Sequence, residues 1–111
     1  MAAAADSVTR VAVPATATKG EVIEIKALAS HPMDNGFMYQ DNGLLIPRWI
    51  INRFEVKYND NLVFSSDWHV AMSSNPYISF HIVAHESGEI EFSWFDDNGA
   101  VYKNSAQITV T

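Results

Sequence analysis

Histidine is the residue type in this chain best suited to metal binding or acid–base chemistry, and there are four. His81 and His85 fall on the same face of one predicted strand. Four residues of extended chain separate their backbones by about 13 Å, too far for two ligands of one ion. His31 and His69 lie in two long predicted loops that can approach each other, but no carboxylate pattern accompanies them. We expect structural or surface roles for all four and predict no metal site.

Nucleophilic and carboxylate chemistry has even weaker support. The chain has no cysteine, which excludes disulfides, thiolate–metal sites, iron–sulfur clusters and a cysteine nucleophile. A serine triad with His69 and Asp67 lacks the Gly-x-Ser-x-Gly turn that would support it. Glu89 and Glu91 share a strand face, where a solubilising row is a simpler interpretation than a catalytic pair set across a cleft. We predict no catalytic residue, no cofactor and no enzymatic activity.

Composition also excludes two classes of partner. Lys and Arg number 7 against 13 Asp and Glu, a formal charge of −6, so we expect no basic face for nucleic acid or for an anionic membrane surface. No stretch approaches the roughly 18 apolar residues that span a membrane. The small-residue start of the chain lacks the basic and apolar regions of a signal peptide, so we expect no export signal.

The elements that would position these side chains are β-strands. Period-2 alternation recurs along the chain, whereas no long stretch shows a helical period. The clearest strand is Glu21–Ser30, in which one face carries Ile23, Ile25, Ala27 and Ala29. The other predicted strands are residues 10–13, 50–58, 62–65, 76–85, 89–95 and 100–111. The predicted inward faces of 76–85 and 89–95 carry Ile78, Phe80, Ile82 and Ala84, and Ile90, Phe92 and Trp94.

Turn signals separate these strands. Asn59–Asn61 predicts one turn. Asp96–Gly99 is the strongest hairpin signal, because Asn-Gly readily adopts the positive φ of tight turns. Val101 has the opposite parity to the inward residues of the last strand, which predicts either a bulge near Asn104 or an edge position. Seven short strands at roughly ten-residue spacing predict an all-β fold, an immunoglobulin-like sandwich of antiparallel strands. We assign residues 1–111 to one domain, with residues 1–8 as a flexible tail.

Two predicted connections are too long for hairpins. They run from His31 to about Trp49 and from about Asp67 to Asn75. Loops longer than about 12–15 residues are uncommon in compact domains and are often functional. Both are rich in aromatic residues and methionine, so they either fold back on the sandwich as a lid or face a partner.

One face of strand 76–85 has an unusual composition. Tyr77, Ser79, His81, Val83 and His85 are together neither core-like nor fully polar. Mixed faces with aromatic residues are common at protein–protein interfaces. Packing beneath a loop is the alternative, and we favour the interface.

Several segments of the chain resemble the SoxZ family, one half of the SoxYZ carrier of bacterial sulfur and thiosulfate oxidation. They are KGEVIEIKALASHPMDNG (19–36), IPRWIINRFEVKYND (46–60), VFSSDWH (63–69), NPYISFHIVAHESGEIEFSWFDDNG (75–99) and the terminal AQITVT. The resemblance extends over nearly the whole chain. Its most specific part is Ser30–Met33, followed by a strand that opens Ile-Ile-Asn.

The resemblance implies a sandwich that binds SoxY, as a heterodimer or in a higher oligomer, and supplies no catalytic group. SoxY carries the sulfur covalently on the cysteine of a flexible arm, which the pair presents to thiosulfate-oxidising Sox enzymes by transient docking. It also implies a periplasmic location, reached by export together with a signal-bearing SoxY. Accordingly, we expect an enzyme-docking surface to include His31, Met33, Asp34, Trp68 and His69. We expect a SoxY interface to include Tyr77, His81 and Val83. A generic surface- or carbohydrate-binding sandwich module is the alternative function.

Overall fold

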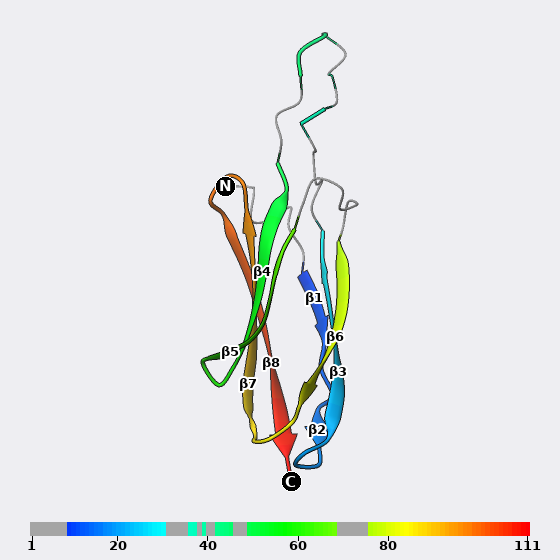
Figure 1. Ribbon diagram of the computed structural model, residues 1–111, viewed down its shortest axis with the longest axis vertical. Coiled ribbons are helices and arrows are strands. Elements are labelled where there is room, and N and C mark those ends of the chain that lie inside the picture. The colour runs from blue at the N-terminus through cyan, green and yellow to red at the C-terminus, as the bar shows by residue number, and fades with distance from the viewer. Residues whose placement is uncertain (1–8, 31–35, 38, 40–41, 46–48, 69–75) are drawn as a thin grey trace.

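The computed structural model describes residues 9–30, 36–37, 39, 42–45, 49–68 and 76–111 (Figure 1). Within these ranges the chain forms eight β-strands and no helix, so none of the described residues belongs to a helix that could cross a membrane. The strands are β1 (Thr9–Ala12), β2 (Thr16–Ala17), β3 (Val22–Ala29), β4 (Ile51–Tyr58), β5 (Asn61–Asp67), β6 (Tyr77–Val83), β7 (Gly88–Asp96) and β8 (Val101–Val110).

The strands form two sheets with the core between them. One sheet has the order β1-β3-β6, and the other has the order β2-β8-β7-β4-β5. Paired strands are antiparallel, except that β2 runs parallel to β8. The predicted all-β sandwich is therefore confirmed. The structure contains one strand more than the seven predicted. This is β2, which the sequence does not reveal because two residues are too few to show alternation.

Alternation places the apolar residues inside, as predicted. The four inward residues of β3 are at most 3% exposed, and the three of β7 are fully buried. Phe54 of β4 lies at the centre, with its ring 5.2 Å from that of Trp94 and 5.6 Å from that of Trp68. Burial of such large apolar side chains is the dominant stabilising contribution to a small domain of this kind.

The predicted turns are also present. Asn59 and Asp60 both have positive φ, 49° and 69°, which suits the tight turn that joins β4 to β5. Gly99, at φ 82°, ends the turn between β7 and β8.

The predicted bulge near Asn104 is wrong. β7 and β8 pair without a shift from Gly88↔Ile108 to Phe95↔Val101. The edge alternative holds for Val101, because β2 pairs only with the last two residues of β8. The register shifts lie where β4 pairs with its two neighbours instead. Asn52 of β4 is left unpaired opposite β7, and Val63 of β5 is left unpaired opposite β4.

The described part of the first long connection forms a finger, residues 36–37, 39 and 42–45. Tyr39 and Leu45 make an isolated antiparallel bridge, and the finger extends beyond the end of both sheets (Figure 1). Phe37 and Tyr39 are 72% and 70% exposed. Of the two alternatives for this connection, a lid is therefore excluded for these residues. Of the second connection, only Asp67 and Trp68 lie within the described residues.

Candidate partner-binding surface

Three residues predicted to contact a partner lie on one face of β6. Tyr77, His81 and Val83 alternate along the strand with Ile78, Phe80 and Ile82, which pack toward the core. Tyr77 is 56% exposed and Val83 is 50% exposed, and His81 is exposed as well. The structure thus brings the three predicted residues together on one solvent-facing strand.

β3 extends this face in register. Val22 lies opposite Val83, and Leu28 lies opposite Tyr77, so apolar pairs stand at both ends of the face. Between them Glu24 lies opposite His81, and its carboxylate is 3.8 Å from the ammonium of Lys26. This exposed ion pair contributes little to stability. The face therefore has apolar ends and a polar centre.

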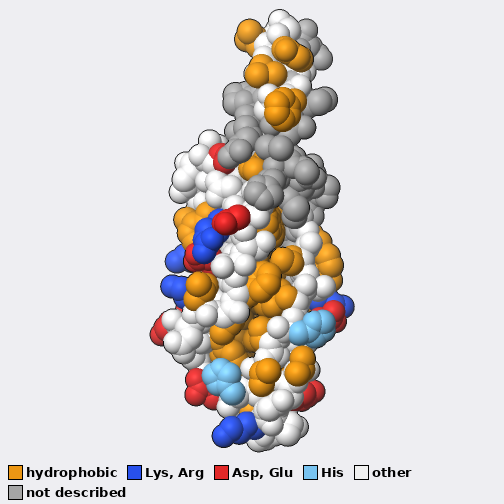
Figure 2. All heavy atoms as spheres, in the orientation of Figure 1, with side chains coloured by type: hydrophobic (Ala, Val, Ile, Leu, Met, Phe, Trp, Pro, Cys, Tyr) orange, Lys and Arg blue, Asp and Glu red, His pale blue; other side chains and the backbone are white. Residues whose placement is uncertain are grey.

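A groove runs beside β6 on the open side of the sandwich. Its volume is about 390 Å³, and it is lined by Tyr58, Val63, His81, Ile82, Val83 and His85. Figure 2 shows apolar side chains gathered between the two sheets, with the two described histidines on either side of them. Between the edge strands β5 and β6, the rings of Phe64 and Phe80 stack with centroids 4.3 Å apart and an interplanar angle of 7°. The six residues that line the groove, together with Tyr77, form what we call the β6 surface.

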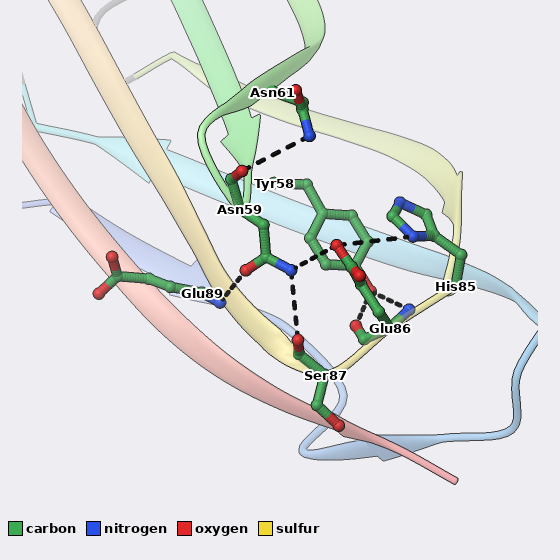
Figure 3. Close-up of polar contacts among 7 residues, drawn as sticks. All are labelled: Tyr58, Asn59, Asn61, His85, Glu86, Ser87 and Glu89. Atoms are coloured by element: carbon green, nitrogen blue, oxygen red, sulfur yellow. Dashed lines mark hydrogen bonds and ion pairs between the residues drawn. The ribbon is translucent and has the colours of Figure 1, made fainter.

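The lower end of the groove is held in place by hydrogen bonds (Figure 3). The hydroxyl of Tyr58 donates to the backbone C=O of Glu86 and accepts from its N–H at 3.2 Å. The ring of His85 lies 4.5 Å from that of Tyr58, and its Nδ1 is 4.0 Å from Oε1 of Glu86. Tyr58, which is only 1% exposed, is therefore fixed as part of the groove wall beside His85.

Asn59 ties the same end of the groove to the turn before β7 (Figure 3). Its Nδ2 donates to Glu86 Oε1 at 2.9 Å and to the C=O of Ser87 at 3.2 Å, and its Oδ1 accepts from the N–H of Glu89 at 3.0 Å. The amide passes so close to Gly88 that a Cβ there would lie 1.8 Å from Oδ1. Only glycine fits beneath Asn59 without disturbing these bonds.

The described residues offer little for metal or acid–base chemistry. They contain no group of three or more His, Asp or Glu side chains that could hold a metal ion. Asp96 is the one buried carboxylate among them, at 5% exposure. Burial raises its pKa, but hydrogen bonds from Tyr102, Trp49 and the backbone N–H groups of Ala100 and Asn98 outweigh that effect and lower the pKa overall.

The burial of the Asp96 carboxylate is explained by the hydrogen bonds that it accepts. Its Oδ2 accepts from Trp49 Nε1 at 2.9 Å and from the Tyr102 hydroxyl at 2.5 Å, and its Oδ1 accepts from two turn amides at 2.9 Å. It anchors the β7–β8 turn to the chain that returns from the finger. The sequence marks Asp96 only as a turn residue.

The predicted enzyme-docking residues have a different outcome. His31, Met33, Asp34 and His69 lie outside the described residues. Trp68 is 5% exposed and its indole stacks on the ring of Phe54. The backbone N–H of Trp68 donates to the C=O of Asn52 at 2.8 Å. Its indole is a core group, so the prediction that it forms part of an exposed surface needs correction.

The finger adds exposed residues that the prediction did not include. Besides Phe37 and Tyr39, Leu44 is 63% exposed and Leu45 is 48% exposed. A signal for this hairpin was available in Asn42-Gly43, where Gly43 has φ 83° and the N–H of Leu44 donates to Asn42 Oδ1 at 3.0 Å.

Several solved structures share this fold at low sequence identity. A superoxide reductase (neelaredoxin) from Ignicoccus hospitalis matches with a TM-score of 0.73 and 9% identity, over 100% of this chain and 88% of that chain. The sulfur carrier protein SoxY from Chlorobium limicola f thiosulfatophilum matches with a TM-score of 0.65 and 15% identity, over 93% of this chain and 78% of that chain. A PKD domain of a peptidase from a Thermoplasmatales archaeon matches with a TM-score of 0.60 and 12% identity, over 93% and 92% of the two chains. These likenesses concern the fold, which hosts unrelated functions.

The family comparison is more specific. No curated protein matches the sequence. The family model for the sulphur oxidation protein SoxZ matches residues 10–107, which include all the strands described above apart from Thr9 and the last residues of β8. The chain therefore belongs to the SoxZ family of sulphur oxidation proteins.

Proposed function

We propose that this protein is a non-catalytic subunit of a SoxYZ sulfur carrier, and that it binds SoxY and helps present the sulfur-bearing arm of SoxY to Sox enzymes. The observation that carries this proposal is the SoxZ family match over residues 10–107, nearly the whole chain. The absence of cysteine supports the division of labour, because a covalent sulfur intermediate on a thiol must then reside on another chain.

The β6 surface is the part of the described chain best suited to bind SoxY. It combines exposed apolar side chains, Tyr77 and Val83, with the imidazoles of His81 and His85 beside a groove. Aromatic residues are enriched at protein interfaces, and an apolar patch rimmed by polar residues marks an interaction site. The Tyr58–Glu86 hydrogen bonds keep this groove formed before a partner arrives, which lowers the cost of ordering on binding.

A second surface is proposed for transient docking to the Sox enzymes. The finger exposes Phe37 and Tyr39 beyond one end of the sheets, whereas the groove of the β6 surface lies toward the other end, so a SoxY subunit at the groove would leave the finger accessible (Figure 1). His31, Met33, Asp34 and His69 remain proposed contributors from the adjoining connections. The periplasm is the proposed compartment, reached by export in complex with SoxY.

Replacement of Val83 by Glu tests the β6 surface. A charge at this half-exposed position would be buried without a partner in the complex, so we expect the affinity for SoxY to fall at least about tenfold. The measurement is calorimetric titration of purified SoxY. Val101→Glu is the matched control, since Val101 is 43% exposed on β8 of the other sheet and should bind normally. If the unmodified chain forms no complex with SoxY, the proposed function is wrong. If the unmodified chain binds SoxY and Val83→Glu binds it equally tightly, the proposed function stands and the assignment of the β6 surface is wrong.

A further inference from the structure

The backbone of β6, as well as its side chains, is open to a partner. β6 is an edge strand whose one neighbour among the described residues is β3. The pairing runs without a register shift from Leu28↔Tyr77 to Val22↔Val83. An edge strand of this kind presents a row of backbone N–H and C=O groups to any chain that can lie beside it.

Two hydrogen bonds at the ends of the strand determine which backbone groups face outward. The N–H of Ala29 donates to the C=O of Pro76 at 3.2 Å, and the N–H of Ala84 donates to the C=O of Glu21 at 2.8 Å. Hydrogen-bonded pairs in an antiparallel ladder alternate with pairs whose polar groups point away. Because Pro76 and Ala84, the hydrogen-bonded residues at the two ends, are both even-numbered, the even-numbered residues of β6 bond to β3. The outward groups belong to Tyr77, Ser79, His81 and Val83.

β6 also lacks the features that normally protect an edge. Its seven residues, YISFHIV, include no charge, no proline and no glycine. Their outward side chains are the exposed, partly apolar residues of the β6 surface, and the groove lies directly beside them. An unprotected, regular edge flanked by an apolar groove is suited to accept an extended strand.

The other edges of the two sheets are guarded. β5 has its register interrupted where Val63 has no paired residue, and Asp67 near its end forms a 2.8 Å ion pair with Arg53. β1 is four residues long, and Asn104 Nδ2 of β8 donates to the C=O of Thr9 at 3.3 Å. β2, the outer strand of the other sheet, has only two residues, and the part of β8 that it leaves unpaired carries Lys103 and is bonded to Thr9 of β1 through Asn104. β6 is therefore the long, unprotected edge strand among the described residues.

We infer that β6 accepts an edge strand of SoxY by backbone pairing, so that a sheet of the partner continues the β1-β3-β6 sheet. This inference rests on the proposed function for the identity of the occupant. The fold likeness to the Chlorobium SoxY, at a TM-score of 0.65, indicates that the partner is itself a strand sandwich with sheet edges to offer. A second copy of this chain is disfavoured, because each copy carries a formal charge of −6.

Amide hydrogen exchange in the complex with SoxY tests the pairing directly. In the free chain the amides of Ile78, Phe80 and Ile82 should already exchange slowly, while those of Ser79 and His81 should exchange fast. On addition of SoxY the odd-numbered amides should become slow too. Contact through side chains alone would leave Ser79 and His81 fast, and that result would overturn the inference.

Ser79→Pro provides a second test, with Ser79→Ala as its matched control. Proline removes one outward N–H and leaves the ladder to β3 intact, so we expect the affinity for SoxY to fall about tenfold for proline and to stay unchanged for alanine. Equal binding by both variants would refute the pairing while leaving the proposed function standing. If proline unfolds the chain, the exchange experiment on the unmodified complex still decides. Slow odd-numbered amides in a dimer of the isolated chain would make a second copy the occupant instead.

Discussion

At the scale of single residues, the polar groups that stand out in the structure hold the chain in place. Asp96 accepts four hydrogen bonds from the turn and from two aromatic side chains. The side-chain amide of Asn59 makes three hydrogen bonds over Gly88. Both come from Asx-rich turns, whose existence the sequence predicts but whose long-range partners it does not. Tyr102 reaches Asp96 across their own β7–β8 hairpin, whereas Trp49 reaches it from the chain that precedes β4.

The lowered pKa of Asp96 predicts a specific loss of stability in acid. Because the folded carboxylate has a lower pKa than the unfolded one, it stabilises the fold above about pH 3.8, and this contribution is lost as the pH falls through the folded pKa. Asp96→Asn should lower the free energy of unfolding at pH 7 by about 2–3 kcal/mol. The measurement is urea unfolding of both proteins from pH 7 to pH 2.5. The difference between them should shrink below about pH 4; a difference independent of pH would contradict the assignment.

At the scale of elements, local alternation predicts the strands and nonlocal packing decides the rest. β3, β6 and β7 follow their patterns of buried residues, and so the surface residues Tyr77, His81 and Val83 could be found from sequence. The register shift opposite Val63 depends on how β4 pairs with two neighbours at once, which no local pattern reveals. Trp68 follows a strand and begins a long connection, and its burial depends on Phe54 from another strand.

The contrast between a core aromatic and a finger aromatic gives a paired prediction. Trp68→Ala should reduce the free energy of unfolding by about 3–5 kcal/mol, because the indole is packed against Phe54. Phe37→Ala should change it by no more than about 0.5 kcal/mol, since Phe37 is 72% exposed. Urea unfolding at neutral pH measures both values. Similar small losses in the two variants would show that Trp68 is not a core residue.

At the scale of the whole molecule, the two proposed binding surfaces lie toward opposite ends. Its extents are 59 × 27 × 18 Å, with the finger beyond one end and the groove of the β6 surface toward the other (Figures 1 and 2). A partner on β6 and an enzyme at the finger would therefore not compete for the same surface. This arrangement suits a subunit that stays bound to one protein while meeting others in turn.

The proposed division of labour predicts where sulfur is found during turnover. When the complex with SoxY is incubated with thiosulfate and the Sox enzymes, the mass of SoxY should increase by that of the bound sulfur species. The mass of this chain should stay constant, because it has no thiol to modify. Intact mass spectrometry of the separated subunits measures both. A sulfur adduct on this chain would contradict a purely non-catalytic role.

The alternation of β6 has a consequence for how such proteins diverge. Even-numbered positions pack toward the core and pair with β3, and under the proposed pairing the odd-numbered positions contact the partner. Selection for folding and selection for recognition therefore act on separate, interleaved sets of residues within one short segment. A duplicated gene can change its partner preference at Tyr77, Ser79, His81 and Val83 with little loss of stability. Related carrier pairs in one cell can become insulated from each other by changes at these four sites alone.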